Sequence, residues 1–95
     1  MPLGTLHGAV VVAELDLHGH TVGSAEDRLE RFLDTHAIRS PGQVVRVITG
    51  KGTHSGGTPV IMEAVREALS DWLAHRVADW GVDVGGGAYL VELPE

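Results

Sequence analysis

Near the start of the chain, a continuous run of apolar residues is followed by a strict alternation of polar and apolar residues. After a tail over residues 1–9, the segment 10–17 begins with three valines and continues with apolar residues at every second position. This pattern predicts a β-strand with one buried face. Because side chains alternate along a strand, Leu17 faces the core and Asp16 and His18 face the opposite side. We therefore expect these two polar side chains to share one surface at the carboxyl end of the strand.

A helical period replaces this alternation in the next segment. Thr21 or Ser24 can cap the helix at its start, and Ser40-Pro41-Gly42 stops it. The apolar positions form one stripe of helical spacing: Val22, Ala25, Leu29, Phe32, Leu33 and Ile38. The charged positions are expected on the solvent side: Glu26, Asp27, Arg28, Glu30 and Arg31.

A short β-branched segment, residues 44–48, predicts a second strand, parallel to the first through a right-handed helical crossover. A loop over residues 49–58 leads to a second helix, with Pro59 in its first turn and its end near His75. Its buried side is predicted to carry Val60, Ile61, Ala64, Val65, Ala68, Leu69, Trp72 and Leu73. Trp72 is thus expected in the core.

Two further strands complete the predicted order. Residues 77–84 form a weaker strand signal, and three glycines separate them from a stronger one over residues 88–93. The order β-α-β-α-β-β predicts an α/β two-layer sandwich, with a small mixed four-stranded sheet and both helices on one face. The last strand could lie at an exposed edge, where strand pairing would permit dimerisation.

Composition limits the classes of protein that this chain can represent. Ninety-five residues suit a single domain, expected over residues 10–95, and the absence of cysteine excludes disulfides and thiolate metal sites. No signal peptide or membrane span is predicted, so we expect a cytoplasmic protein without a membrane partner. The net charge of -6 opposes long-range attraction to nucleic acid, although a small local site is less constrained.

A glycine-rich cationic loop, Thr49-Gly50-Lys51-Gly52, follows the second strand. Glycine lets a backbone approach a phosphate closely, and Lys51 supplies a positive charge. The alternative is a tight turn that needs glycine for its dihedral angles. The spacing differs from that of a nucleotide-binding P-loop. Ligands of open α/β sheets bind beyond the carboxyl ends of the strands, where this loop, Asp16 and His18 are all expected, beside the amino end of the second helix.

Several motifs in their order resemble the Smr (small MutS-related) domain family over about residues 14–93. They are Leu15-Asp16-Leu17-His18-Gly19, Thr21-Val22, Val47-Ile48-Thr49-Gly50-Lys51-Gly52, Trp72-Leu73 and Gly86-Gly87-Ala88-Tyr89-Leu90-Val91. The resemblance implies a fold like the carboxyl-terminal domain of bacterial translation initiation factor three. It also implies a nucleic-acid endonuclease or a nucleic-acid-binding module.

The resemblance assigns candidate roles to individual residues. Asp16 and His18 match the acidic and imidazole positions of the first family motif: the imidazole can move a proton, and the carboxylate can orient it or hold a metal. Lys51, by its charge in the glycine-rich loop, is the third candidate catalytic residue and can meet the phosphate. The candidate nucleic-acid contacts are Gly19, His20, Thr49, Gly50, Lys51, Gly52, His54 and Ser55. The structural alternative is a carboxylate that holds a neighbouring loop and a histidine that hydrogen-bonds it.

Several alternatives stay open at this point. The substrate could be RNA, whose 2′-hydroxyl can serve as nucleophile, or DNA, for which Mg²⁺ or Mn²⁺ would be expected. His18 and His20 could chelate zinc, but no further ligands accompany them. Arg46 could pair with Glu14 or Glu92, or bind phosphate. The second helix begins without the basic residues common in Smr domains, so a protein partner could deliver the domain to its target. A protein-interaction domain is the third function considered.

Overall fold

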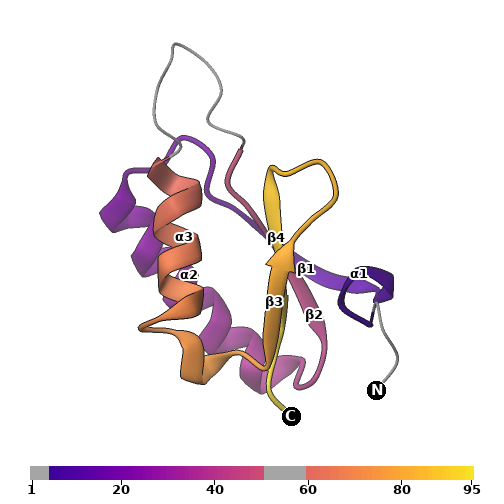
Figure 1. The fold of residues 1–95 in the computed structure, drawn as a ribbon. Helices are drawn as coiled ribbons and strands as arrows, with labels where there is room; N and C mark the ends of the chain where they lie inside the picture. The colour runs from indigo at the N-terminus through magenta and orange to yellow at the C-terminus, as the bar shows by residue number, and fades with distance from the viewer. Residues whose placement is uncertain (1–4, 51–59) are drawn as a thin grey trace.

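A computed structural model describes residues 5–50 and 60–95 of the chain (Figure 1). The elements in order are α1 (Thr5–Gly8), β1 (Val11–Asp16), α2 (Val22–Arg39), β2 (Val44–Ile48), α3 (Val60–Ser70), the 3-10 helix η2 (Ala74–Arg76), β3 (Asp79–Val82) and β4 (Ala88–Glu92). The predicted order of four strands and two main helices is confirmed. The short elements α1 and η2 are additional.

The four strands form one mixed sheet in the order β1-β2-β4-β3. Strands β1 and β2 run parallel, as predicted, whereas β4 is antiparallel to both of its neighbours. The expectation that the last strand lies at an edge is therefore wrong. Strand β4 is inserted between β2 and β3 and is almost entirely buried, so the edges of the sheet are β1 and β3.

Helices α2 and α3 cover one face of the sheet, which gives the predicted two-layer α/β sandwich (Figure 1). The core between the two layers contains Leu17, Ala25, Leu29, Leu33, Val45, Val47, Val65, Ala68, Leu69, Leu73, Tyr89, Val91 and Leu93. These residues come from both helices and from β2 and β4, together with the ends of the neighbouring segments. Each buried side chain of this size contributes roughly 1.5–3 kcal/mol by leaving water.

Four apolar residues that the helical period assigned to the buried stripes are exposed, all near helix ends: Val22, Ile38, Val60 and Trp72. Ile38 is 83% exposed and Trp72 is 39% exposed. Ile38 lies in the last turn of α2, beyond the buried part of the helix. Helix α3 ends at Ser70, and the Leu73 amide donates to the Ala68 carbonyl at 2.7 Å. This contact returns Leu73 to the core while Trp72 stays outside, because the helical period no longer applies there.

Part of the expected N-terminal tail is helical and packs on the open face of the sheet. Leu6 of α1 is 9% exposed and clusters with Val44 and Leu90. The His7 ring Nε2 lies 2.8 Å from the Val82 carbonyl oxygen. Helix α1 therefore covers part of the sheet face opposite α2 and α3 (Figure 1).

Arg46 joins three strand regions on this opposite face. Its guanidinium pairs with Glu14 of β1, one of the alternatives left open by the sequence, and with Asp83 at 2.8 Å, just after β3. It does not pair with Glu92, which lies opposite Val44 in the strand register. The hydrogen bonds that the Arg46 guanidinium donates to these carboxylates raise the pKa of Arg46 and lower the pKa of Asp83. Arg46 is thus paired with two carboxylates, and its charge is not available for the phosphate contact considered from the sequence.

Replacing Asp83 with asparagine should lower the free energy of unfolding by about 1 kcal/mol at pH 7, because the charge partner of Arg46 is lost. The pKa of Asp83 is lowered in the folded protein, so its contribution is complete above its ordinary value of 3.8 and is lost as the pH falls through the lowered value. Urea unfolding at pH 7 and under acidic conditions measures this difference. Asp79→Asn removes a β3 carboxylate that hydrogen-bonds only its neighbour's amide, and it is the matched control. A D83N deficit that persists in acid would contradict the expectation.

Candidate functional site

The carboxyl ends of β1 and β2 meet at one edge of the sheet. The Leu17 amide donates to the Ile48 carbonyl at 2.7 Å, so the chain leaves both strands at the same level. Helix α3 also begins at this end of the molecule (Figure 1). The two sequence motifs therefore start side by side, as expected for parallel neighbours.

A tight turn after β1 presents His18. The His20 amide donates to the Leu17 carbonyl at 3.1 Å, and Gly19 has φ +83°, a value that suits glycine at the third position of such a turn. The Asp16 carboxylate accepts from the His18 backbone amide at 2.9 Å. Leu17 is fully buried, whereas Asp16 and His18 on either side of it are exposed. A core anchor and a carboxylate thus hold the backbone of the histidine in place.

The segment after β2 is held by β4. The amides of Thr49 and Gly50 both donate to the Gly87 carbonyl at 3.0 Å, and the Thr49 hydroxyl donates to the Gly50 carbonyl at 2.9 Å. Thr49 is buried, with 6% of its surface exposed. The paired glycines before β4 were the sequence signal for this close approach, but the contact of Gly87 with the site was not predicted.

Gly50 lies directly against the ring of His18. A Cβ atom at Gly50 would be 3.4 Å from His18 Cδ2, and its φ is +77°. The positive φ is a backbone conformation that favours glycine, and the Gly50 amide is bonded to the Gly87 carbonyl. The two motifs are therefore in contact through His18 and Gly50.

The start of α2 also borders the turn. Thr21 caps the helix and accepts from the Ser24 amide at 3.2 Å, as predicted, and the His20 ring Nδ1 lies 3.1 Å from the Ser24 hydroxyl. Ser24 was considered only as a cap in the sequence. This hydrogen bond connects the turn after β1 to the first turn of α2.

The carboxylate and the imidazole do not contact each other. Asp16 bonds the His18 backbone, and in the part of the chain that the structure describes the His18 imidazole has no hydrogen-bond partner. The same residues hold no group of three or more histidine and carboxylate side chains suited to a metal ion. Four predicted site residues, Lys51, Gly52, His54 and Ser55, lie outside the described residues.

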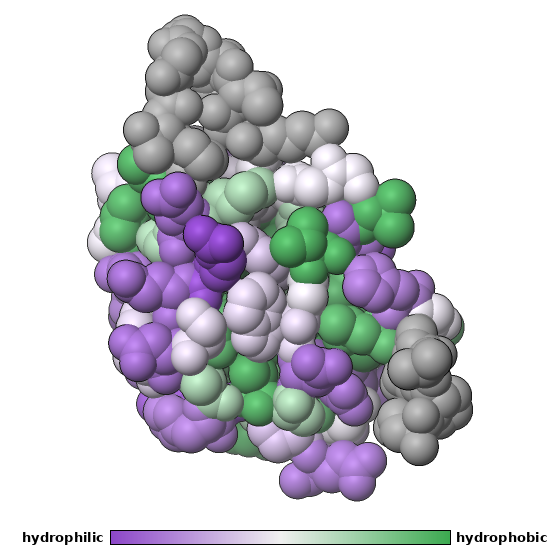
Figure 2. Space-filling model, viewed as in Figure 1, coloured by the Kyte–Doolittle hydropathy of each residue, from purple (hydrophilic) through white to green (hydrophobic). Residues whose placement is uncertain are grey.

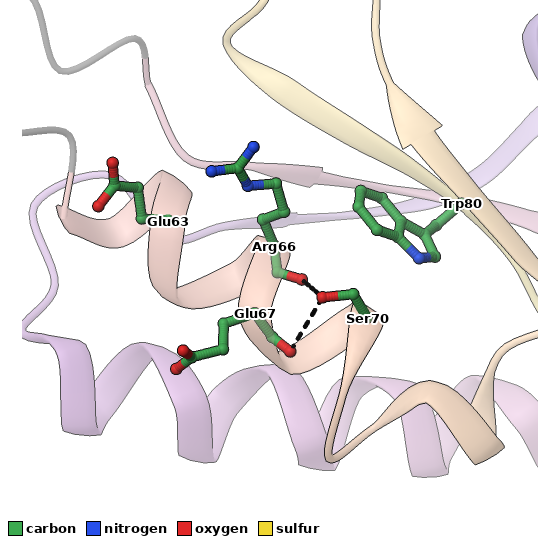
Figure 3. Close-up of a pocket in the computed structure, with 5 residues that line it drawn as sticks. All are labelled: Glu63, Arg66, Glu67, Ser70 and Trp80. Atoms are coloured by element: carbon green, nitrogen blue, oxygen red, sulfur yellow. Dashed lines mark hydrogen bonds between the residues drawn. The ribbon is translucent and has the colours of Figure 1, made fainter.

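Two surface grooves flank the helices. The larger, about 540 Å³, lies between α3 and β3 and is lined by Glu63, Arg66, Glu67, Ser70 and Trp80 (Figure 3). The Ser70 hydroxyl donates to the Arg66 carbonyl at 2.7 Å, and Trp80 packs edge-on against Tyr89 with ring centroids 5.6 Å apart. Burial raises the pKa of the Tyr89 hydroxyl. Two carboxylates beside one guanidinium make this groove unfavourable for phosphate.

The second groove, about 370 Å³, lies between β1 and α2 and is lined by Leu15, Ser24, Asp27, Arg28 and Arg31.

The view in Figure 2 shows hydrophilic side chains gathered over the helical layer and apolar ones on the strand side. Two valines at the end of β3 and just after it are exposed: Val82, 51% exposed, and Val84, 88% exposed. In residues 5–50 and 60–95, no helix has the length and apolar character needed to cross a membrane.

The family model of the Smr domain matches residues 15–94 of the chain. The chain belongs to the Smr domain family. The match includes the turn after β1, the segment after β2 and the whole of β4, which together form the site described above. The Smr family is known for nuclease and nucleic-acid-binding roles.

Solved Smr structures share the architecture of this Smr domain. The Smr domain of Thermus thermophilus MutS2 is 28% identical, with a TM-score of 0.74 over 88% of this chain and 100% of that chain. The Smr domain of NEDD4-binding protein 2 is 30% identical, with a TM-score of 0.67 over 93% of this chain and 92% of that chain. YdaL, a stand-alone small MutS-related protein from Escherichia coli, is 23% identical, with a TM-score of 0.76 over 98% of this chain and 74% of that chain. At this identity, the similarity to YdaL supports the fold and not a shared activity. No curated protein matches the chain.

Proposed function

We propose that this Smr domain is an endonuclease that cleaves phosphodiester bonds in RNA or DNA. The observation that carries the proposal is the position of Gly50 beside the exposed His18 ring, where β1 and β2 end: a Cβ atom built on Gly50 would be 3.4 Å from His18 Cδ2. An imidazole that is exposed and has no hydrogen-bond partner in the described chain can transfer a proton to or from a bound substrate. Because Gly50 has no side chain, its backbone can come close to a phosphate group beside the ring.

The residues around His18 have distinct roles in this proposal. Asp16 is a positioning residue, because its carboxylate bonds the His18 amide and thereby holds the turn. Lys51 follows Gly50 directly and supplies the positive charge for the phosphate in the transition state. If Mg²⁺ or Mn²⁺ takes part, the Asp16 carboxylate is the oxygen ligand that the described site offers.

In RNA cleavage, His18 would remove the proton of the 2′-hydroxyl, whose oxygen attacks the adjacent phosphorus. The bond from phosphorus to the 5′-oxygen breaks, and a proton is returned to that oxygen. The products are a 2′,3′-cyclic phosphate and a 5′-hydroxyl. In DNA cleavage, an activated water attacks phosphorus, the bond to the 3′-oxygen breaks and that oxygen takes up a proton, so the products carry a 5′-phosphate and a 3′-hydroxyl.

The test is an assay of product ends with RNA and DNA strands of the same sequence, each with Mg²⁺, with Mn²⁺ and with EDTA. We expect cleavage of at least one strand. Cyclic phosphate ends in EDTA indicate the 2′-hydroxyl route, and 5′-phosphate ends that require a divalent ion indicate hydrolysis. Intact substrates under every condition would contradict the endonuclease proposal.

A noncatalytic nucleic-acid-binding module is the second candidate, and the net charge of -6 favours weak binding that depends on a delivering protein partner. Under this alternative, Lys51→Ala weakens binding and lowers the salt slope by about one, with no cleavage by the parent protein. A protein-interaction domain would show no salt-dependent affinity for nucleic acid.

A further inference from the structure

We propose that the groove between the edge strand β1 and helix α2 binds the sugar-phosphate backbone of a single strand next to the scissile phosphate, with Arg28 as its main cation. This proposal rests on the proposed function and extends its site. The groove is about 370 Å³ in volume and is lined by β1 on one side and α2 on the other.

The groove continues directly from the turn that presents His18. Ser24 lines the groove and also lies 3.1 Å from the His20 ring, in the turn after β1. Leu15, one residue before Asp16, forms the apolar wall. A strand whose phosphate lies beside His18 can therefore continue past Ser24 into the groove.

The charges in the groove favour a phosphate. Arg46 and Arg76 are each paired with two carboxylates, and Arg31 is paired with Asp27 at 3.3 Å. Arg28 has no ion-pair partner among the residues that the structure describes. An exposed guanidinium without a carboxylate partner is suited to bidentate contact with phosphate oxygens.

The position of Arg28 on α2 determines how far from the turn after β1 it can contact a bound nucleic-acid strand. Arg28 follows Ser24 by one helical turn, which corresponds to about 6 Å, and Arg31 lies about 10 Å from Ser24. Arg28 therefore meets a phosphate within a few nucleotides of the one beside His18, whereas Arg31 is already paired with Asp27. The larger groove beside α3 does not offer this charge, since Glu63 and Glu67 accompany Arg66 there (Figure 3).

The test compares Arg28→Gln with Arg39→Gln, which removes a cation on the same helix in its last turn, far from the turn after β1. Arg39 also has no ion-pair partner within the described residues. The probe is a fluorescein-labelled decamer of 2′-O-methyl RNA, which resists cleavage through the 2′-hydroxyl, and the readout is fluorescence anisotropy at several salt concentrations. We expect R28Q to weaken binding about five- to tenfold and to lower the salt slope by about one, whereas R39Q changes neither.

A dinucleotide is too short to reach Arg28, so the loss caused by R28Q should be larger for the decamer than for the dinucleotide. If R28Q and R39Q bind the decamer equally well and the parent protein cleaves RNA or DNA, the proposed role of the groove is wrong and the proposed endonuclease function stands. A loss in Arg66→Gln instead of R28Q would also overturn it, because the strand would then run along α3. A parent protein that neither binds nor cleaves would overturn the proposed function and the groove together.

Discussion

Replacing His18 with alanine should lower the rate of phosphodiester cleavage by about 10²- to 10⁴-fold, the range that general acid–base catalysis contributes. The His18 side chain is exposed and makes no hydrogen bond within the described chain, so its loss removes chemistry and not packing. The free energy of unfolding should change by less than about 0.5 kcal/mol, as for other surface substitutions. Single-turnover cleavage and urea unfolding measure the two effects.

The control for this prediction is His75→Ala, which removes an exposed histidine in η2 and should leave cleavage unchanged. Equal cleavage by the parent protein and H18A would attribute the activity to a contaminant and end the catalytic role of the imidazole. The pair Asp16→Asn and Asp16→Ala separates charge from turn geometry. Asparagine keeps an oxygen that can accept from the His18 amide, and alanine does not. If Asp16 acts only by positioning, D16N retains more activity than D16A.

Leu17→Ala should lower the free energy of unfolding by about 2–5 kcal/mol, the usual cost of removing a buried leucine. Leu17 has 0% of its surface exposed and belongs to the central core cluster. It also lies between Asp16 and His18, so the cavity forms directly beneath the turn that presents the imidazole. Small domains have total stabilities of roughly 5–15 kcal/mol, and this substitution removes a large part of that.

The matched control is Leu69→Ala, on α3, where the leucine is 1% exposed. Both variants should lose comparable stability, as urea unfolding will show. Below the unfolding transition, L17A should also lose cleavage rate because His18 is less well held, whereas L69A should keep the rate of the parent protein. If the two variants retain the same activity for each folded molecule, Leu17 supports only the core and does not position the site.

The strands and the first helix were predictable because their signals are local. The alternation before Asp16 and the β-branched run over residues 44–48 predicted β1 and β2, and Thr21 was correctly considered as the cap of α2. The errors occurred at helix ends. Ile38 and Trp72 fit the helical period, but burial depends on how far the sheet extends below a helix and on where the helix stops.

The candidate site was predictable in part for the same reason. Strand alternation placed Asp16 and His18 on one exposed surface, and the parallel pairing of β1 and β2 brought the glycine of the second motif beside the first. The hydrogen bond from the His18 backbone amide to the Asp16 carboxylate could not be predicted. The residue types alone do not show whether the carboxylate accepts from the backbone or from the imidazole of His18. The contact of Gly87 with Thr49 and Gly50 depends on β4 lying beside β2.

The sequence by itself determined the order of the strands and main helices along the chain. It also determined the exposure of His18 and the positions of the two motifs at the ends of neighbouring strands. Periodicity and turn residues encode these features within a few residues of chain. Only the tertiary structure decided that β4 is internal, that Arg46 is held by Glu14 and Asp83, and that Arg28 has no ion-pair partner among the described residues and lines a groove beside the turn. These features join residues far apart in the chain, and their geometry depends on sheet order and packing, which no local pattern records.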